Sequence, residues 1–163
     1  MARTLLISLV SCLFTVNQAR IVHCCDLAKL LYKEDMNGLQ GYSVSDWLCL
    51  ALVESKFNTS KISENADGSF DYGISQINSH CWCNDYPSCS ENLCHVDCLE
   101  LLEPKLLSSI KCVKRILFEE GGLKNWIQWK LPCSEPRASV KRTQVPGCHL
   151  QMKRATQKKF LYL

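Results

Sequence analysis

Two carboxylic acids, Glu54 and Asp71, occupy contrasting sequence surroundings. Glu54 follows an almost wholly apolar segment, Trp47 to Val53, where a carboxylate has little structural reason to lie. Asp71 stands between Phe70 and Tyr72 in a stretch that also contains serine, asparagine and glutamine. Apolar surroundings raise the pKa of a carboxyl group, whereas polar ones leave it ionised. This pair could therefore supply a proton donor and an anion, although the residues alone also allow two solvated surface acids.

Helical patterns surround the first of these acids. The segment "CDLAKLLYKEDM" spaces three leucines for one helical face, and Asn37-Gly38 is expected to end that helix. In "YSVSDWLCLALVESKF", Ser43 and Asp46 have the spacing of a capping box. The residues that follow are apolar on every side, which predicts a buried helix with Glu54 at its end.

A strand pattern surrounds the second acid. Asp67-Gly68 is a hairpin-turn signal, and the apolar residues of 70–75 alternate with Asp71, Gly73 and Ser75. Asp71 is therefore expected on the strand face opposite the aromatic residues, where it could border a groove.

The rest of the chain predicts loops followed by more helix. Residues 79–98 are rich in loop residues and cysteine, after which Pro104 can open a helix that Gly121-Gly122 ends. A short helical piece, "LKNWIQWK", follows. Helices, a small sheet and further helices in that order predict an α+β fold with two lobes.

The first nineteen residues resemble an export signal. They carry Arg3, an apolar run from Leu5 to Val16 that is too short to span a bilayer, and small or polar residues up to Ala19. We expect a secretory signal peptide at 1–19, with a buried N-terminal helix as the alternative. No later apolar run is long enough for a transmembrane segment, so we expect a soluble, secreted, extracellular protein.

Twelve cysteines in 163 residues favour disulfide bonds, because an exported chain reaches an oxidising compartment. Zinc is the rival explanation, but "CWC" is too close for a zinc knuckle, and His80, His95 and His149 do not pair with cysteines at ligand spacing. Removal of the leader also removes Cys12 and leaves an odd number of cysteines.

Charge is distributed unevenly along the chain. Residues 20–148 hold 14 lysines and arginines against 16 acids, a net charge of −2, whereas the tail 149–163 has four basic residues and no acid. A mildly acidic domain argues against a basic cleft for nucleic acid.

Several phrases occur in the order and spacing of a known family, namely "CDLA", "GYSVSDWLCLALVESKFN", "NADGSFDYGISQIN", "WCND", "NLC" and "NWIQWKLPC". From about Arg20 to Cys148 the chain resembles the C-type lysozyme/α-lactalbumin family, and in particular the lysozyme-like proteins of the male reproductive tract. The resemblance implies a two-lobed domain at 20–148, with a mostly helical lobe, a small antiparallel sheet and stapling disulfides. It also implies a monomer without a cofactor, located on the sperm surface or in the acrosome.

The same resemblance implies the disulfide pairing, which the sequence alone cannot choose. The implied pairs are Cys25–Cys148, Cys49–Cys133, Cys83–Cys98 and Cys94–Cys112. Cys24, Cys81 and Cys89 are left over. Cys81 could pair with Cys89 or with Cys24, and closeness in the chain favours a Cys81–Cys89 bridge with Cys24 as the odd thiol.

By resemblance, Glu54 is the general acid of a retaining glycoside hydrolase, and Asp71 is its nucleophile or ion stabiliser. The implied substrate is a polysaccharide or a glycoprotein glycan, above all the β-1,4-linked polymers of N-acetylmuramic acid and N-acetylglucosamine. Bacteriolytic, antimicrobial and fertilisation roles are expected with it. The implied substrate-binding residues are Asn65, Gln76, Asn78, Trp82, Glu119 and Trp126, the last packing against the acid.

Two departures from the family favour weaker activity. Active lysozymes commonly have an aromatic residue where this chain has Cys81, and they are commonly basic, which helps them reach anionic cell walls. A weakly active glycan-binding protein on gametes is therefore an alternative. An α-lactalbumin-like modifier is disfavoured because both carboxylates are present. No metal is expected, since the segment 99–111 lacks the clustered aspartates of a calcium site.

Overall fold

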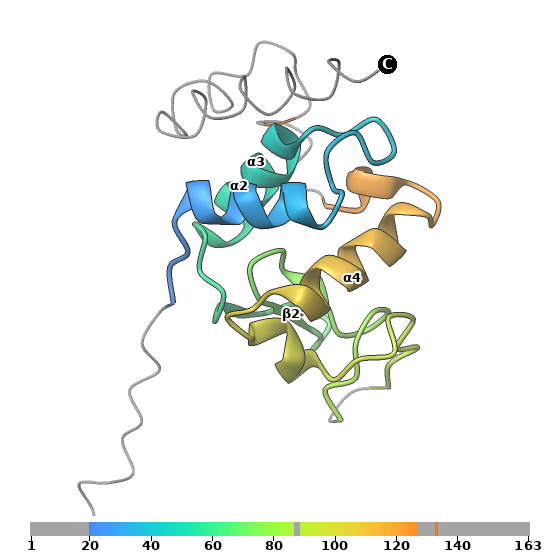
Figure 1. Ribbon diagram of the computed structural model, residues 1–163. Helices are drawn as coiled ribbons and strands as arrows, with labels where there is room; N and C mark the ends of the chain where they lie inside the picture. The colour runs from blue at the N-terminus through green and yellow to red at the C-terminus, as the bar shows by residue number, and fades with distance from the viewer. Residues whose placement is uncertain (1–19, 87–88, 127–132, 134–163) are drawn as a thin grey trace, which may run out of the picture.

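The computed structural model describes residues 20–86, 89–126 and 133. Its elements are, in chain order, α2 (Cys24–Lys33), α3 (Val44–Ser55), β1 (Ile62–Glu64), β2 (Phe70–Tyr72), β3 (Ile77–Asn78), η1 (Cys98–Leu102), α4 (Leu107–Leu117) and η2 (Gly122–Asn125). Figure 1 shows α2 and α3 together at one end, the sheet and loops at the other, and α4 running between them. The predicted α+β class is confirmed for this part of the chain.

Helix α3 begins and ends as its sequence predicts. The Asp46 carboxylate accepts hydrogen bonds from the Ser43 N–H (2.8 Å) and hydroxyl (2.7 Å), which is the predicted capping interaction. Lys56 ends the helix in a left-handed conformation (φ 55°). Trp47 is buried, and its indole N–H donates to the Met36 carbonyl at 2.9 Å. The helix therefore lies in the core, and its last turn presents Glu54.

Helix α2 is shorter than predicted. It ends at Lys33, and Asp35 takes a left-handed conformation (φ 53°) well before Asn37-Gly38. Lys114 of α4 donates from its Nζ to the carbonyl of Glu34, the C-terminal capping residue. A tertiary contact therefore satisfies the end of this helix, which local sequence could not reveal.

The three strands form an antiparallel sheet in the order β1-β2-β3. Gly68 (φ 80°) occupies the predicted hairpin turn between β1 and β2. The expectation that the β2 strand continues to Ser75 is wrong, because Gly73 turns the chain (φ 74°) directly after Tyr72. A Cβ atom at Gly73 would lie 2.3 Å from the Leu101 carbonyl oxygen, so the sheet approaches η1 more closely than any side chain would allow.

Helix α4 begins later than predicted. Pro104 lies before it, and the N-terminal capping residue, Leu106, is left-handed (φ 59°). The preceding residues form the 3₁₀ helix η1, whose capping residue Asp97 accepts a hydrogen bond from the Leu99 N–H. The helical part of the predicted segment "LKNWIQWK" is seen as η2, while residues 127–132 lie outside the described part.

Disulfides join distant parts of the described chain. The bridges Cys49–Cys133, Cys83–Cys98 and Cys94–Cys112 confirm three of the pairs implied by resemblance. Cys148 lies outside the described residues, so its pairing with Cys25 stays a prediction.

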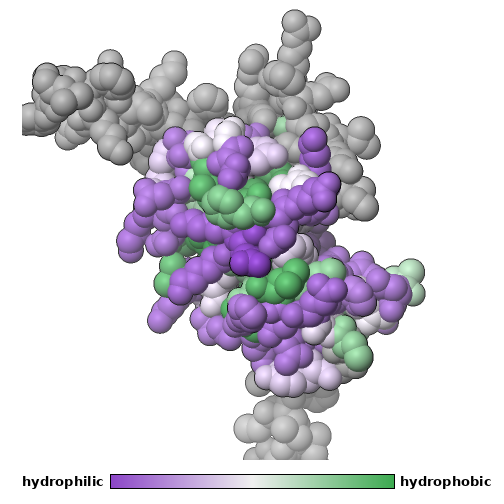
Figure 2. Space-filling model, turned by 90° about the vertical axis from the view of Figure 1, so that its right-hand side faces the viewer, coloured by the Kyte–Doolittle hydropathy of each residue, from purple (hydrophilic) through white to green (hydrophobic). Residues whose placement is uncertain are grey.

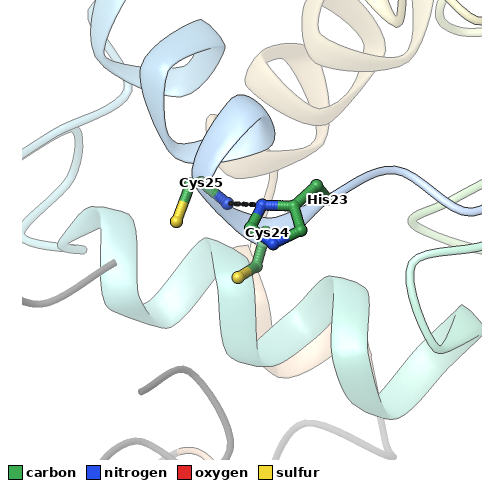
Figure 3. A group of neighbouring side chains, drawn as sticks. All are labelled: His23, Cys24 and Cys25. Carbon is green, nitrogen blue, oxygen red and sulfur yellow. Dashed lines mark hydrogen bonds between the residues drawn. The ribbon is translucent and has the colours of Figure 1, made fainter. Parts of the chain in front are cut away.

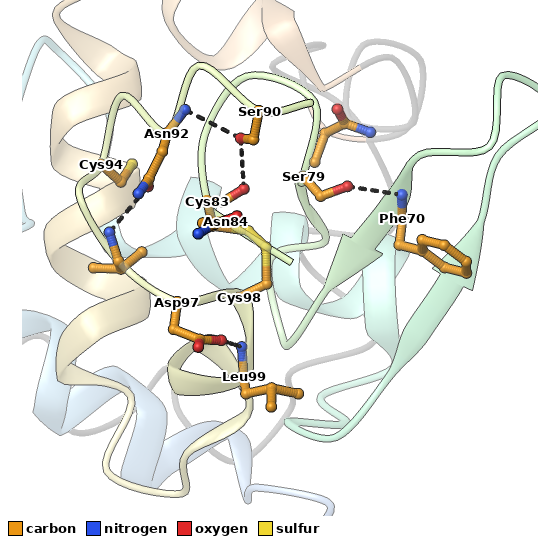
Figure 4. The surroundings of a disulfide bond; sticks show 12 residues. Phe70, Ser79, Cys83, Asn84, Ser90, Asn92, Cys94, Asp97, Cys98 and Leu99 are labelled. Atoms are coloured by element: carbon orange, nitrogen blue, oxygen red, sulfur yellow. Dashed lines mark hydrogen bonds between the residues drawn. A yellow bond between two sulfur atoms is a disulfide. The ribbon is translucent and has the colours of Figure 1, made fainter. Parts of the chain in front are cut away.

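The loop around Cys83–Cys98 is held by polar contacts as well as by its bridge. Figure 4 shows the Ser90 hydroxyl donating to the Cys83 carbonyl at 2.7 Å and accepting from the Asn92 N–H at 3.1 Å. These bonds fix the chain that follows Trp82.

The expected Cys81–Cys89 bridge is not formed in the structure. The carbonyl of Cys81 accepts from the Leu93 N–H (2.9 Å), and that of His80 accepts from Glu91 (3.1 Å). The backbone thus sets Cys81 beside the far end of the loop, while Cys89 is exposed. Closeness in the chain predicted the wrong partner because backbone hydrogen bonds join His80 and Cys81 to Glu91 and Leu93, beyond Cys89.

The surface in Figure 2 is mainly hydrophilic, with separate hydrophobic areas in both halves of the described molecule. The large exposed hydrophobic residues of the described chain are also dispersed over different elements: Ile21, Ile62, Tyr86, Leu99, Leu107 and Phe118. We therefore assign no docking surface to them. None of the described helices has the length and hydropathy needed to cross a membrane.

Candidate active site

A cleft of about 590 Å³ contains both carboxylic acids of the sequence prediction. Its walls come from the end of α3, the sheet, the loop after β3, α4 and the end of η2. The lining residues from the prediction are Glu54, Asn65, Asp71, Gln76, Asn78, Trp82 and Trp126. Residues far apart in the sequence are thus brought into one groove of a size usual for ligand sites.

Glu54 has the surroundings of a proton donor. It is 9% exposed at the end of α3. Burial raises the pKa of its carboxyl from 4.5 to about 7; the positive charge of Lys61 opposes this rise, and the negative charge of Asp71 adds to it. The group therefore keeps its proton at mildly acidic pH, where an ordinary glutamate is ionised.

Asp71 is held by a hydrogen-bond network on the sheet. It lies opposite Asn78 in the β2–β3 pairing, and Asn78 donates from Nδ2 to Asp71 Oδ1 at 2.8 Å. The same Nδ2 donates to Ser69 Oγ (2.9 Å), and this hydroxyl donates to Asp67 Oδ1 (2.7 Å) and accepts from Asn65 Nδ2 (3.2 Å). These bonds fix the position of the Asp71 carboxylate on the sheet and link it, through Asn78 and Ser69, to the turn between β1 and β2.

Gln76 has a supporting position in the structure. Its side chain donates to the carbonyls of Gly73 (2.9 Å) and Lys61 (3.2 Å) and accepts from the Ser63 hydroxyl (2.6 Å). The residue is only 7% exposed. These contacts tie the turn after β2 to β1 and so hold the strand that carries Asp71.

The two tryptophans of the cleft differ in burial. Trp126 is buried, and its indole N–H donates to the Ser75 carbonyl at 2.6 Å, which fixes the ring between η2 and the sheet. Trp82 is half-buried on the loop after β3 and offers part of its ring to the cleft. Such partly exposed aromatic faces are suited to stacking against sugar rings.

Glu119 is the one predicted substrate-binding residue that does not line the cleft. Its carboxylate forms an ion pair with Arg115 at 3.1 Å, one turn earlier along α4 and its extension. The partners are substantially exposed, so the pair itself contributes little to stability. The structure thus leaves Glu119 outside the group formed by the other predicted residues.

Asn125 lines the cleft but was missed by the sequence reasoning. It is exposed, and its side-chain amide makes no hydrogen bond within the described part of the chain. A Cβ atom on Gly121 would lie 2.7 Å from Asn125 Oδ1, so the glycine leaves room for this amide. Its position directly before Trp126 was the one sequence signal available.

Three adjacent residues at the start of α2 could hold a metal ion. Figure 3 shows His23, Cys24 and Cys25, whose candidate ligand atoms lie within 4.8 Å of one another. The ring of His23 also accepts a hydrogen bond from the Cys25 N–H at 3.3 Å. Because the expected bridge to Cys148 would consume Cys25, we do not propose a metal site.

Comparisons with known proteins agree with the geometry. The profile of the C-type lysozyme/alpha-lactalbumin family matches residues 20–143. The chain is 59% identical over 150 residues to lysozyme-like protein 6 of Mus musculus, covering 92% of this chain and 99% of that one. It is 43% identical to sperm acrosome-associated protein 5 of Bos taurus, covering 83% and 85% of the two chains.

A solved structure shows the same fold. The crystal structure of lysozyme from Equus asinus superposes with a TM-score of 0.71 at 35% identity, covering 77% of this chain and 98% of that one. The fold around the cleft is therefore the lysozyme fold.

Proposed function

Because the chain belongs to the C-type lysozyme/alpha-lactalbumin family, we propose that it is a retaining glycoside hydrolase, a bacteriolytic muramidase. Its substrates are β-1,4-linked polymers of N-acetylmuramic acid and N-acetylglucosamine. One observation carries the proposal: a single cleft holds Glu54, whose pKa is raised to about 7, and Asp71, whose carboxylate is held by Asn78. Two carboxyl groups in such different surroundings are suited to opposite roles.

The roles follow those of lysozymes, which are the standard case of this chemistry. Glu54, protonated, donates to the glycosidic oxygen as the bond to the anomeric carbon breaks. Asp71, ionised, attacks that carbon or stabilises the positive charge that develops on the sugar. Glu54 then removes a proton from the water that releases the sugar, which restores both groups.

The decisive experiment is a turbidity assay on bacterial cell walls with wild-type protein and the Glu54→Gln variant. The amide has the shape of the acid but cannot donate a proton in this way, so lysis should disappear while oligosaccharide binding remains. Asp71→Asn should also lose most of the rate. Lysis by the Glu54→Gln variant at the wild-type rate would exclude the proposed acid.

The stereochemistry of the product gives an independent test. Carboxyl groups about 5 Å apart leave no room for an attacking water and give retention, whereas inverting enzymes need a wider separation. We expect the first-formed sugar to keep its anomeric configuration, as followed by NMR during hydrolysis of a chitin oligomer. An inverted first product would contradict the role of Asp71.

A second candidate function is glycan binding on gametes with little turnover. Cys81 stands where an aromatic stacking residue is common, and residues 20–148 carry a net charge of −2. One relative is named as acrosome-associated in sperm, which agrees with secretion to the sperm surface or acrosome. Stable binding of chitin oligomers by the wild-type protein, without products over days, would favour this function.

A further inference from the structure

Lys61 supplies the positive charge that the end of helix α3 lacks. The last turn of this helix contains no basic residue of its own. Lys61 follows from outside the helix, and its Nζ donates to the carbonyl oxygen of Glu54 at 2.5 Å. A cation at a helix C-terminus satisfies an unpaired carbonyl and interacts favourably with the helix dipole.

The backbone of Lys61 is fixed from the opposite side by the sheet. Its carbonyl accepts from the Gly73 N–H at 2.8 Å and from Gln76 Nε2 at 3.2 Å. Both donors belong to the turn after β2, the strand that carries Asp71. Lys61 therefore connects the end of the acid's helix with the strand of the second carboxylate.

The charge of Lys61 also acts on the Glu54 side chain. Two charged groups act on this carboxyl, Lys61 next to β1 and Asp71 on β2, and their effects oppose each other. Burial and Asp71 favour the protonated acid, whereas Lys61 favours the carboxylate. Without Lys61, the acid would hold its proton to higher pH.

We propose that Lys61 is a positioning residue that fixes the end of α3 at the cleft and sets the upper pH limit of catalysis by Glu54. This inference rests on the proposed hydrolase function. Lys61 is not among the residues that line the cleft, so we expect it to act by positioning Glu54 and not by contact with the substrate.

The chain offers a matched control in Lys114. Its Nζ donates to the carbonyl of Glu34 at the end of α2, also at 2.5 Å. Lys114 thus makes the same type of contact with a helix end, but Glu34 does not line the cleft. Loss of either lysine should lower stability, whereas only loss of Lys61 should change the acid.

The experiment measures kcat/KM on a neutral chitin oligomer against pH for wild type, Lys61→Met, Lys61→Gln, Lys61→Arg and Lys114→Met. In Lys61→Met and Lys61→Gln the alkaline limb of the pH profile should move to higher pH by roughly 1 unit. This is the low end of the pKa change that a nearby opposite charge causes. Gln keeps a hydrogen-bond donor and so provides a folded variant if Met is too unstable. Lys61→Arg and Lys114→Met should follow the wild-type limb.

A titration of the Glu54 carboxyl by ¹³C NMR separates failure of this inference from failure of the proposed function. If wild type hydrolyses nothing, the muramidase proposal fails, yet the NMR midpoint should still rise in Lys61→Gln. Unchanged midpoints in both Lys61 variants that lack the charge would overturn the inference. An equal shift in Lys114→Met would also overturn it, because the effect would then not be local.

Discussion

Some polar side chains in the cleft already form hydrogen bonds within the protein, whereas others are available to a ligand. The amide of Asn78 donates to Asp71 and Ser69, and its oxygen accepts from the His80 N–H. Gln76 is equally occupied by protein partners. Among the described amides of the cleft, Asn125 has no such commitment, so it is the strongest candidate to read a sugar hydroxyl or acetamido group.

We predict that Asn125→Ala raises KM for a chitin oligomer by about tenfold, the equivalent of one lost hydrogen bond of about 1–1.5 kcal/mol. The pH profile should not change, because Glu54 keeps its surroundings. Steady-state kinetics against wild type would measure the effect, with the neighbouring exposed Lys124→Ala as control. An unchanged KM in Asn125→Ala would show that this amide does not contact substrate.

The two carboxylates of the cleft could be predicted from the sequence, whereas the residues that contact them could be predicted only in part. The apolar helix before Glu54 and the polar strand around Asp71 are both visible as local sequence patterns. The roles proposed for the two acids came from the family resemblance. Glu119 was predicted at the cleft by position, yet its ion pair with Arg115 could be seen only in three dimensions. Lys61 was also missed, because its contact with Glu54 depends on how the chain returns after α3.

At the scale of elements, α3 carries the proposed acid, Glu54, at a cost in stability. The pKa of Glu54 near 7 lies above its ordinary value of 4.5, so the folded state binds more protons than the unfolded state between these pH values. The stabilising effect of protonated Glu54 is therefore complete below pH 4.5 and is lost as pH rises through 7.

We predict that Glu54→Gln makes the protein more stable than wild type at pH 8, by roughly 1–3 kcal/mol. The neutral amide does not have to ionise inside the cleft, so the difference should vanish near pH 4.5. Urea unfolding at both pH values measures it, and the exposed Glu103→Gln change serves as control. If Glu54→Gln is less stable than wild type at pH 8, burial of the ionised Glu54 carboxylate does not destabilise the folded protein as we predict.

Element boundaries show where local sequence rules stop. The capping box at Ser43 and the turn at Gly68 are local devices, and both were predicted correctly. The start of α4 was misplaced because Leu106 adopts a left-handed conformation, which the presence of Pro104 does not predict. The end of α2 was misplaced because Asp35 turns the chain before Asn37-Gly38, and the capping residue Glu34 is contacted by Lys114, which is distant in sequence.

For the whole molecule, the uneven charge predicts two separable activities. Residues 20–148 carry a net charge of −2, whereas the tail 149–163, which lies outside the described residues, has four basic residues. Contacts between a basic segment and an anionic surface weaken with salt, because ions screen them. The tail is therefore expected to contribute to surface attachment more than to catalysis.

Deletion of Leu150 to Leu163 should reduce binding to vesicles that contain anionic lipid at low salt. Hydrolysis of a neutral chitin oligomer should stay unchanged. Vesicle co-sedimentation at two salt concentrations and the oligomer assay measure the two effects, with vesicles of neutral lipid as control. Equal losses in both assays would place the tail at the cleft instead.

The close approach of Gly73 to Leu101 bears on inherited variation. With a φ of 74° and only 2.3 Å between a hypothetical Cβ and a backbone oxygen, this position accepts no other amino acid without moving the sheet away from η1. The strand displaced in that way is the one that bears Asp71. Missense alleles at codon 73 should consequently behave as loss-of-function alleles, although the residue has no side chain to offer a substrate.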